Sequence, residues 1–470
     1  MVREGDALKK IGVSAELFKD HSPLKLGANG RHNGRSFTLV GRLQYGYGAQ
    51  IATSAQADAV EGTWNEWYAL FDDGASGWLS EDNDQYVFSF DVAAPAYLPA
   101  STQIAPGATL RIGGIQWSVA SLVSAKLLAA VGELPAAPPL QRVYPIADLR
   151  STVNRVATID YADPKRPGFS VGQPVRLETL GLKDVEPEEA TVVDARKFNC
   201  PGCGASVTVN LAGTQSITCS ACQRLIDVSK GIGAELKAFV QYRTQGPRIP
   251  LGSSGTLSVG DLHGKTWQIV GFSVKKGNVD HPDPEERFTW SEYLLYNREE
   301  GFAFMIDSVD GWVCYRTLTG APVGDASSAT VSWNGGRFRQ VESYTAAVSY
   351  VEGEYYWKVD KGQRVEVVDF EGTGNKIRER LSCETSDNEV VWSWGVTMPA
   401  SVIAMAFKVS LPATLALGDA GPTSGGDLGP AQFIFVAFIV LFMILASQCS
   451  CDEDGQNCRS GSHSGTGFHK

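Results

Sequence analysis

The stretch Thr63-Trp64-Asn65-Glu66-Trp67-Tyr68-Ala69-Leu70-Phe71 carries the pattern that decides the fold. It is rich in aromatic residues, which favour β-strands, and it runs into the turn Asp72-Asp73-Gly74. Successive side chains of a strand point to opposite faces, and here aromatic residues occur at both parities. Both faces of the strand should therefore meet apolar surroundings. We expect a small β-barrel or β-sandwich rather than a sheet with one face in water.

The same pattern returns later in the chain. Thr289-Trp290-Ser291-Glu292-Tyr293-Leu294-Leu295-Tyr296 repeats the order Thr-Trp-x-Glu-aromatic 226 residues further on (289 − 63), and Asp369 follows Asp148 by 221 (369 − 148). Landmarks that recur in the same order indicate duplication of one domain. We predict a mainly β chain with two related barrel- or sandwich-like domains, repeat 1 at residues 26–183 and repeat 2 at residues 250–410.

Composition limits the classes of partner. The chain has 470 residues, of which 43% are hydrophobic and 20% charged, so it is long enough for several domains with buried cores. Its formal net charge is −11. Nucleic-acid binding needs clustered lysine and arginine side chains, so this charge disfavours a nucleic-acid partner.

Four cysteines between the repeats have the spacing C-x2-C-x15-C-x2-C: Cys200, Cys203, Cys219 and Cys222. Two such pairs bring four thiolates together, the ligand set that zinc prefers in closed structural sites. We predict a small zinc ribbon at residues 198–231, with structural zinc as the cofactor. A redox dithiol pair or an iron–sulfur centre is the alternative, although the βαβ context typical of a redox motif is missing.

The C-terminal part of the chain predicts a membrane anchor. Residues 433–446 are uninterruptedly apolar, and the surrounding 24 residues 428–451 carry no charge. As a helix they would extend over about 36 Å, enough to cross a bilayer. We therefore predict a transmembrane helix at residues 431–448. The N-terminus lacks the apolar core of a signal peptide, so the bulk of the chain is expected in the cytoplasm and the short tail beyond the inner membrane.

Shorter segments complete the predicted order. They are an N-terminal segment 1–25, an acidic linker 184–197, a Gly/Pro linker 411–430 and a Gly/Ser-rich tail 449–470. Cys449, Cys451 and Cys458 in the tail could form a disulfide, bind a metal, carry a modification or have no role. Cys314 and Cys383 lie in strand-like surroundings and are expected to be core thiols.

No sequence motif of a known catalytic site is present, and we predict no enzymatic activity. Glu66 and Glu292 fall at corresponding positions of the two repeats, between aromatic residues. They are candidates for a paired ligand-binding role, with structural hydrogen bonding as the alternative. The segment Asp280-His281-Pro282-Asp283 could bind a metal, and a solvated loop explains it equally well.

Distinctive motifs then point to a family. Repeat 1 contains G-R-S-F-T-L-V-G-R (34–42), W-N-E-W-Y (64–68), G-W-L-S-E (77–81) and G-E-L-P (132–135), and repeat 2 contains W-S-E-Y (290–293), G-E-Y-Y-W (353–357) and L-S-C-E-T (381–385). These segments resemble the bacterial domain-of-unknown-function family 4178, over about residues 26–183 and 250–408. The resemblance implies a CPxCG-type zinc ribbon and a membrane anchor. It also implies genes for polyamine-synthesis-like and small membrane proteins nearby, and a role in the envelope or in stress. No catalytic residue follows from it.

These observations predict a bacterial, membrane-anchored, non-enzymatic binding or scaffold protein of the envelope. In this hypothesis the repeats provide the binding surfaces for a ligand or a protein partner at the membrane, and the ribbon acts as a rigid spacer. The alternative is an enzyme or accessory subunit that acts on a cationic small molecule such as a polyamine. Glu66, Glu292 and the aromatic residues around them would then line the pocket.

Overall fold

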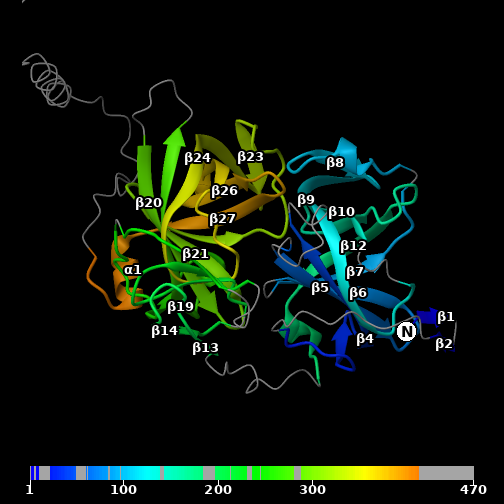
Figure 1. Cartoon of the computed structure of the whole chain (residues 1–470). Coiled ribbons are helices and arrows are strands. Elements are labelled where there is room, and N and C mark those ends of the chain that lie inside the picture. Colours follow the sequence, from blue (N-terminus) through cyan, green and yellow to red (C-terminus); the bar gives the residue numbers. More distant parts are fainter. Residues whose placement is uncertain are drawn as a thin grey trace, which may run out of the picture. The chain divides into compact units, whose positions relative to one another are not determined.

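Both repeats fold as closed eight-stranded β-barrels, coloured from blue to teal and from green to orange in Figure 1. The computed structural model describes residues 2–4, 7–9, 22–48, 60, 62–82, 85–95, 97–137, 142–183, 196–211, 213–229, 236–243, 245–279 and 287–411. The prediction of a mainly β chain with two related domains is thus confirmed, and the choice left open between barrel and sandwich is resolved as a barrel in each repeat.

In the first barrel two meanders of four strands join edge to edge. Around the barrel the strands are β4 (Arg35–Tyr47), β5 (Gly62–Phe71), β6 (Ser76–Asp82), β7 (Gln85–Asp91), β12 (Gly168–Val175), β11 (Val156–Asp160), β10 (Val143–Ser151) and β9 (Ile115–Gly132). Pairing of β4 with β9, from Gly41↔Gly132 to Tyr47↔Ala125, closes the ring. Strands β3 (Asn29–His32) and β8 (Thr109–Ile112) extend it, and β1 (Val2–Glu4) pairs separately with β2 (Ala7–Lys9).

The second barrel has the same topology. Its strands in order are β19 (Lys265–Val279), β20 (Arg287–Asn297), β21 (Gly301–Ser308), β22 (Gly311–Thr317), β27 (Val390–Met398), β26 (Glu379–Thr385), β25 (Arg364–Gly372) and β24 (Gly336–Tyr355). The β24–β19 pairing closes it, and β18 (Ser254–Leu257) and β23 (Thr330–Trp333) are its extra strands. Helix α1 (Ala400–Phe407) follows β27 and packs beside β18.

Each barrel is itself built from two similar halves, which the sequence analysis did not predict. The long strand of every half has one bulged residue where it pairs with the next strand: Val40, Ala120, Val270 and Val341. A backbone hydrogen bond also recurs in the first three halves. The N–H groups of Gly27, Gly107 and Gly252 each donate to the carbonyl oxygen of the strand residue just before the bulge, at 2.7–2.8 Å. The chain therefore contains four copies of a five-stranded unit.

Alternate side chains of the barrel strands have different environments. In repeat 1 one set forms two apolar clusters, around Trp67 in the first half and Trp117 in the second, both tryptophans being almost fully buried. The other set lines an interior cavity to which all eight strands contribute. This division explains why aromatic residues occupy both parities of β5: Trp67 and Phe71 belong to a cluster, whereas Trp64 lines the cavity.

The cysteine-containing segment is part of the second barrel's sheet. Its hairpin β13 (Arg196–Asn199) and β14 (Ser206–Val209) is followed by β15 (Ser216–Thr218), β16 (Leu225–Asp227) and β17 (Lys237–Phe239). Strand β15 pairs with the end of β24 through Ser216↔Tyr355 and Ile217↔Glu354. The Glu354 carboxylate also accepts hydrogen bonds from the backbone N–H groups of Asn210 and Leu211 at 3.0 Å. The ribbon thus extends this barrel, whereas the sequence analysis expected a spacer between two domains.

Several predictions concern residues outside the described ranges. They are the linker residues 184–195, the loop 280–283, the Gly/Pro linker from 412 to 430, the membrane segment 431–448 and the tail 449–470 with its three cysteines. Within the described part of the chain, α1 is the sole α-helix, and no helix has the length and apolarity required to span a bilayer.

Candidate functional sites

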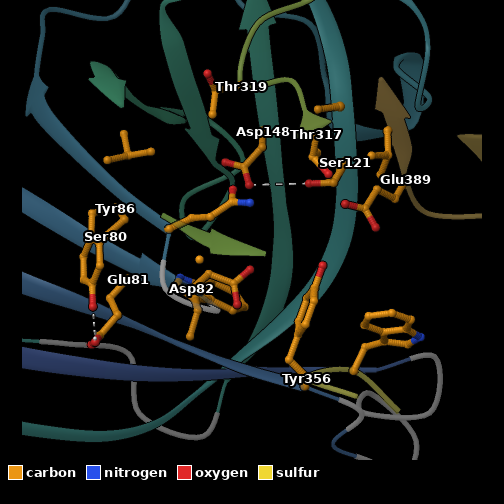
Figure 2. Close-up of a pocket in the computed structure, with 18 of the residues that line it drawn as sticks. Ser80, Glu81, Asp82, Tyr86, Ser121, Asp148, Thr317, Thr319, Tyr356 and Glu389 are labelled. Atoms are coloured by element: carbon orange, nitrogen blue, oxygen red, sulfur yellow. Dashed lines mark hydrogen bonds between the residues drawn. The ribbon is translucent and has the colours of Figure 1, made fainter. Parts of the chain in front are cut away.

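The cavity lined by the strands of the first barrel is acidic, and it is continuous with the space lined by the second barrel. The carboxyl groups of Glu66, Asp82, Asp91, Asp148 and Asp160 line it, together with hydroxyl groups and aromatic rings. Among the described strand residues of this barrel, Arg150 is the only lysine or arginine that lines the cavity. Figure 2 shows Ser80 and Asp82 from β6 and Ser121 and Asp148 from β9 and β10 around this space, together with Thr317, Tyr356 and Glu389 of the second repeat. A lumen with this lining attracts cations.

Glu66 lies on β5 and is held by two neighbours. Trp64 Nε1 donates to its Oε1 at 3.1 Å, and Ser80 Oγ donates to its Oε2 at 2.6 Å. Burial raises the pKa of Glu66 to about 7; the hydrogen bond from Ser80 opposes the shift and the carboxylate of Asp148 adds to it. A cation beside Glu66 would favour the charged form and release the proton.

Two further carboxylates come from the other half of the barrel. Asp148 accepts a hydrogen bond from Thr158 Oγ1 at 2.8 Å and one from Ser121 Oγ at 3.5 Å (Figure 2). Asp160 accepts from the backbone N–H of Ala162 at 2.6 Å, and burial raises its pKa. Within the described part of the chain, no lysine or arginine forms an ion pair with Glu66, Asp148 or Asp160.

Aromatic side chains complete the wall of this cavity. The rings of Tyr45 and Trp64 stack with centroids 4.9 Å apart, and the hydroxyl of Tyr144 donates to that of Tyr45 at 3.3 Å. Burial raises the pKa of Tyr144 to about 12 and that of Tyr45 well above its ordinary value, so both phenols stay neutral. Carboxylates beside aromatic faces form a suitable environment for an organic cation.

The second barrel places the corresponding carboxylates in the same strand register. Glu66 faces Ser80 and Glu292 faces Ile306, while Asp148 faces Thr158 and Asp369 faces Ser382. Glu384 likewise corresponds to Asp160, because they face Val367 and Ile146 two residues before Asp369 and Asp148. The predicted pair Glu66 and Glu292 therefore occupies equivalent positions, one in each lumen, and each glutamate has partners of its own.

One substitution changes the charge of the second lumen. Lys275 pairs with Trp290 as Tyr45 pairs with Trp64, so the lysine stands at the tyrosine's position. Its Nζ lies 2.9 Å from Glu292 Oε2 and 3.7 Å from Glu384 Oε1. Burial disfavours the charge on Lys275, but the two carboxylates outweigh burial and raise the lysine pKa above its ordinary value. The second lumen carries an ammonium group of its own.

The carboxylate of repeat 2 that corresponds to Asp148 also has a hydrogen-bond partner. The hydroxyl of Tyr344 donates to Asp369 Oδ2 at 2.9 Å. Sequence reasoning noted the correspondence of Asp148 and Asp369 but gave neither a role, and it missed Asp160, Glu384 and Lys275. The signal that identifies them is strand register, which places residues far apart in the chain around one lumen.

The four ribbon cysteines form a candidate metal centre. Their sulfur atoms all lie within 4.8 Å of one another, with 3.7 Å between Cys200 and Cys222 and 3.8 Å between Cys203 and Cys219. A tetrahedron with zinc–sulfur bonds of about 2.3 Å has edges of about 3.8 Å. The four thiols therefore fit a tetrahedral metal ion, and they would fill all four positions.

Two matching turns build this centre. The residues after the second cysteine of each pair, Gly204 and Gln223, have left-handed backbone conformations with φ of 76° and 61°. Their N–H groups donate to the carbonyl oxygens of Cys200 and Cys219 at 2.8 Å, which closes each turn. The N–H of Gly202 points to Cys200 Sγ at 3.4 Å, as expected for a thiolate ligand.

The other described cysteines belong to hydrophobic cores. Cys314 is 4% exposed and packs in the cluster around Trp267, and Cys383 is fully buried in the cluster around Phe370. Burial raises the pKa of both thiols to about 12, so neither is a reactive thiolate. Both were predicted as core thiols, and their burial confirms this.

Comparison with known protein families assigns the chain to one family. Residues 25–177 and 258–400 match the model of the family described as "Domain of unknown function (DUF4178)". The chain belongs to this family and contains two tandem copies of its domain, each of which covers most of one barrel. Neither the curated proteins nor the solved structures contain a significant match to the chain.

Proposed function

We propose that the chain is a non-enzymatic binding protein that takes a cationic amine into the lumen of its first barrel. The observation that carries the proposal is the comparison of the two lumens. In the second barrel, carboxylates at the positions of Glu66 and Asp160 surround an ammonium group, that of Lys275. In the first barrel the same positions carry carboxylates without such a group. An ammonium group supplied by a ligand would fill the equivalent place.

The chemistry of the wall defines the ligand class. Buried carboxylates bind a cation strongly because little water competes for it. Tyr45, Trp64 and Tyr144 add aromatic faces that suit methylene groups and the cation itself. We therefore propose an aliphatic amine, with linear polyamines as the leading class.

A thermal-shift series tests this proposal. Spermidine, putrescine and the uncharged butane-1,4-diol are titrated at constant ionic strength against the full chain. We expect a saturable rise in Tm with the amines alone, which Glu66→Gln removes. Asp72→Asn is the matched control, because Asp72 is an exposed carboxylate in the β5–β6 turn. Equal shifts for the diol, or an unchanged shift in Glu66→Gln, would contradict the proposal.

For the metal centre we propose structural zinc bound by Cys200, Cys203, Cys219 and Cys222. The sulfur geometry and the closed ligand set support this identity. Zinc would supply cross-linking of the two turns and leave no position open for a substrate. Metal analysis of freshly purified protein should give about one zinc per chain. Iron with the absorption of an iron–sulfur centre, or no metal at all, would reject it.

We also propose that residues 431–448 anchor the chain in a membrane, where the barrels would present their ligand or a protein partner. The uncharged run 428–451 supports this part of the proposal. The test is carbonate extraction of membranes, with Ile439→Lys/Phe442→Lys as the variant. Each charge at the centre of the span costs about 3 kcal/mol. We expect the wild type to stay in the pellet and the variant to be released; release of both would contradict anchoring.

A further inference from the structure

The lumen of the second barrel keeps the acidic groups of the first and adds a lysine. Lys275 and Glu292 are largely buried, with side chains 14% and 9% exposed. The carboxylate of Glu384, whose side chain is 45% exposed, approaches the same ammonium group to 3.7 Å, so two carboxylates share one ammonium group. A buried charge needs such compensation, so an ammonium group is an integral part of this lumen.

A second observation points to a ligand in the same lumen. Tyr355 is 3% exposed, and its hydroxyl has no hydrogen-bond partner among the described residues. It lines the cavity together with Ser273, Lys275 and Glu292. Burial raises the pKa of Tyr355 well above its ordinary value, the carboxylate of Glu292 adds to the shift, and the neighbouring hydroxyl of Ser273 opposes it. A buried hydroxyl without a partner is costly, so this group has hydrogen-bonding capacity left for a ligand.

Strand pairing shows that this hydroxyl is peculiar to the second repeat. Gly271 pairs with Gly353 as Gly41 pairs with Gly132. A Cβ atom on Gly271 would lie 3.1 Å from Tyr355 Cζ, and one on Gly41 would lie 3.0 Å from Leu134 Cδ2. The glycine therefore makes room for the tyrosine ring in one barrel and for leucine in the other. The second lumen has exchanged two neutral positions for an ammonium group and a hydroxyl.

We propose that the second barrel is a latent binding site for an alkylammonium ion, kept closed by Lys275, whose ammonium group occupies the place of the ligand's. The ligand class rests on the proposed function, whereas the site is made of different residues. A free alkylammonium has three N–H donors for Glu292, Glu384 and the Tyr355 hydroxyl. Lys275 is tethered to β19 and leaves the hydroxyl unused. The native chain therefore binds one amine rather than two.

Chemical rescue tests this proposal. Lys275→Ala removes the ammonium group and the methylene stem, and n-butylammonium supplies both as a separate molecule. Lys276→Ala is the matched control, because Lys276 is the next residue on β19 and is exposed. We expect Lys275→Ala to have a lowered Tm that n-butylammonium restores saturably and n-butanol does not. Calorimetry should show one more site per chain than in Lys276→Ala, with about tenfold weaker binding after the additional change Glu292→Gln.

The outcomes separate this proposal from the proposed function. A folded Lys275→Ala protein without rescue and without the extra site would overturn the latent site, whatever the first barrel binds. If this variant does not fold, Lys275→Tyr introduces the residue that the first barrel has at this position, and the same extra site is expected. Rescue of Lys275→Ala in a chain whose wild type binds no amine would leave the latent site standing and reject the proposed function.

Discussion

The two barrels share strand order, bulges and three carboxylate positions, but they differ in how the carboxylates are neutralised. In the second barrel Lys275 and Tyr344 lie against Glu292, Glu384 and Asp369. In the first barrel Glu66, Asp148 and Asp160 have hydroxyl, indole and backbone N–H donors instead. Uncharged donors leave a net negative lumen. We propose that, after duplication, the second barrel supplies its own cation and the first barrel takes one from a ligand.

The barrels also differ in their contacts with the cysteine-containing ribbon. The second carries the ribbon, which pairs with β24 and is held by Glu354. A second contact comes from Tyr350, whose hydroxyl donates to Gln223 of the ribbon at 2.6 Å. We therefore assign the second barrel a structural role and the first a binding role.

The largest effect is expected from removal of the proposed zinc ion. Cys200→Ser/Cys203→Ser should abolish zinc binding, which contributes about 10–16 kcal/mol in isolated zinc-finger peptides. Because the ribbon continues the sheet of the second barrel, protection from hydrogen exchange should fall in β15 and at the end of β24. Strands β4 and β9 of the first barrel should keep theirs. Equal loss in both barrels would refute the division of roles.

The second-largest effect is expected from a substitution that removes the charge of Lys275 and keeps most of its side-chain volume. Lys275→Met keeps a stem of similar length but leaves the buried carboxylate of Glu292 without its cation, which costs about 3–5 kcal/mol. Burial raises the pKa of Glu292, so this carboxyl takes up a proton as the pH falls. The deficit in the free energy of unfolding should therefore be largest above neutral pH and shrink toward pH 5. Urea titrations at both pH values measure it; a deficit that grows on acidification would contradict the ion pair.

Binding in the first barrel should depend on pH through Glu66. Its pKa of about 7 means that the ligand-free group holds a proton over much of the range below neutrality, while a bound ammonium group requires the carboxylate. Amine affinity should rise between pH 6 and pH 8, with proton release detectable by calorimetry in two buffers. Glu66→Gln should weaken binding about tenfold, or ~1.4 kcal/mol, and make the pH profile less steep, leaving the part due to Asp82, whose pKa burial also raises to about 7. A profile that this variant leaves unchanged would assign the titration to another group.

The same raised pKa affects stability without ligand. Glu66 binds a proton more tightly in the folded state, with a pKa of about 7, than at its ordinary value of 4.5. Its contribution to stability is therefore full below pH 4.5 and is lost as the pH rises through 7. The difference between wild type and Glu66→Gln should follow this course.

The smallest effect is expected at Tyr45. Tyr45→Phe keeps the ring that stacks on Trp64 and removes the hydroxyl that accepts from Tyr144. Loss of one such hydrogen bond costs about 0.5–1.5 kcal/mol. Amine affinity should change by less than in Glu66→Gln, because the carboxylates stay in place. A larger loss, measured by the same calorimetric titration, would make the hydroxyl pair the main ligand contact.

The sequence was sufficient for the features that depend on local pattern. Enrichment in aromatic residues predicted the strand containing Trp64 and Trp67, and cysteine spacing predicted the centre around Cys200. Recurrence of Thr-Trp-x-Glu predicted the duplication and placed Glu66 and Glu292 at equivalent positions. Each of these signals is a pattern of residue types within a short stretch of chain, or the return of such a stretch later in the sequence.

The remaining features depend on pairing between distant segments. Closure of each barrel requires β4 to meet β9 and β19 to meet β24, about 80 residues apart, and nothing in either strand alone specifies its partner. The role of Lys275 follows from this closure, because Glu384 comes from a different meander. The half-barrel repeat has no distinctive sequence signal, because its four bulged positions carry valine three times and alanine once, and both are common strand residues.

The central claim is that one barrel binds an amine and the other holds its own ammonium group. Its most direct measurement is the stoichiometry of spermidine binding to the full chain by isothermal titration calorimetry at pH 8. The account predicts one saturable site per chain, weakened about tenfold by Glu66→Gln and unchanged by Asp72→Asn. Two equivalent sites, no heat of binding, or a single site that Glu66→Gln leaves unchanged would contradict it.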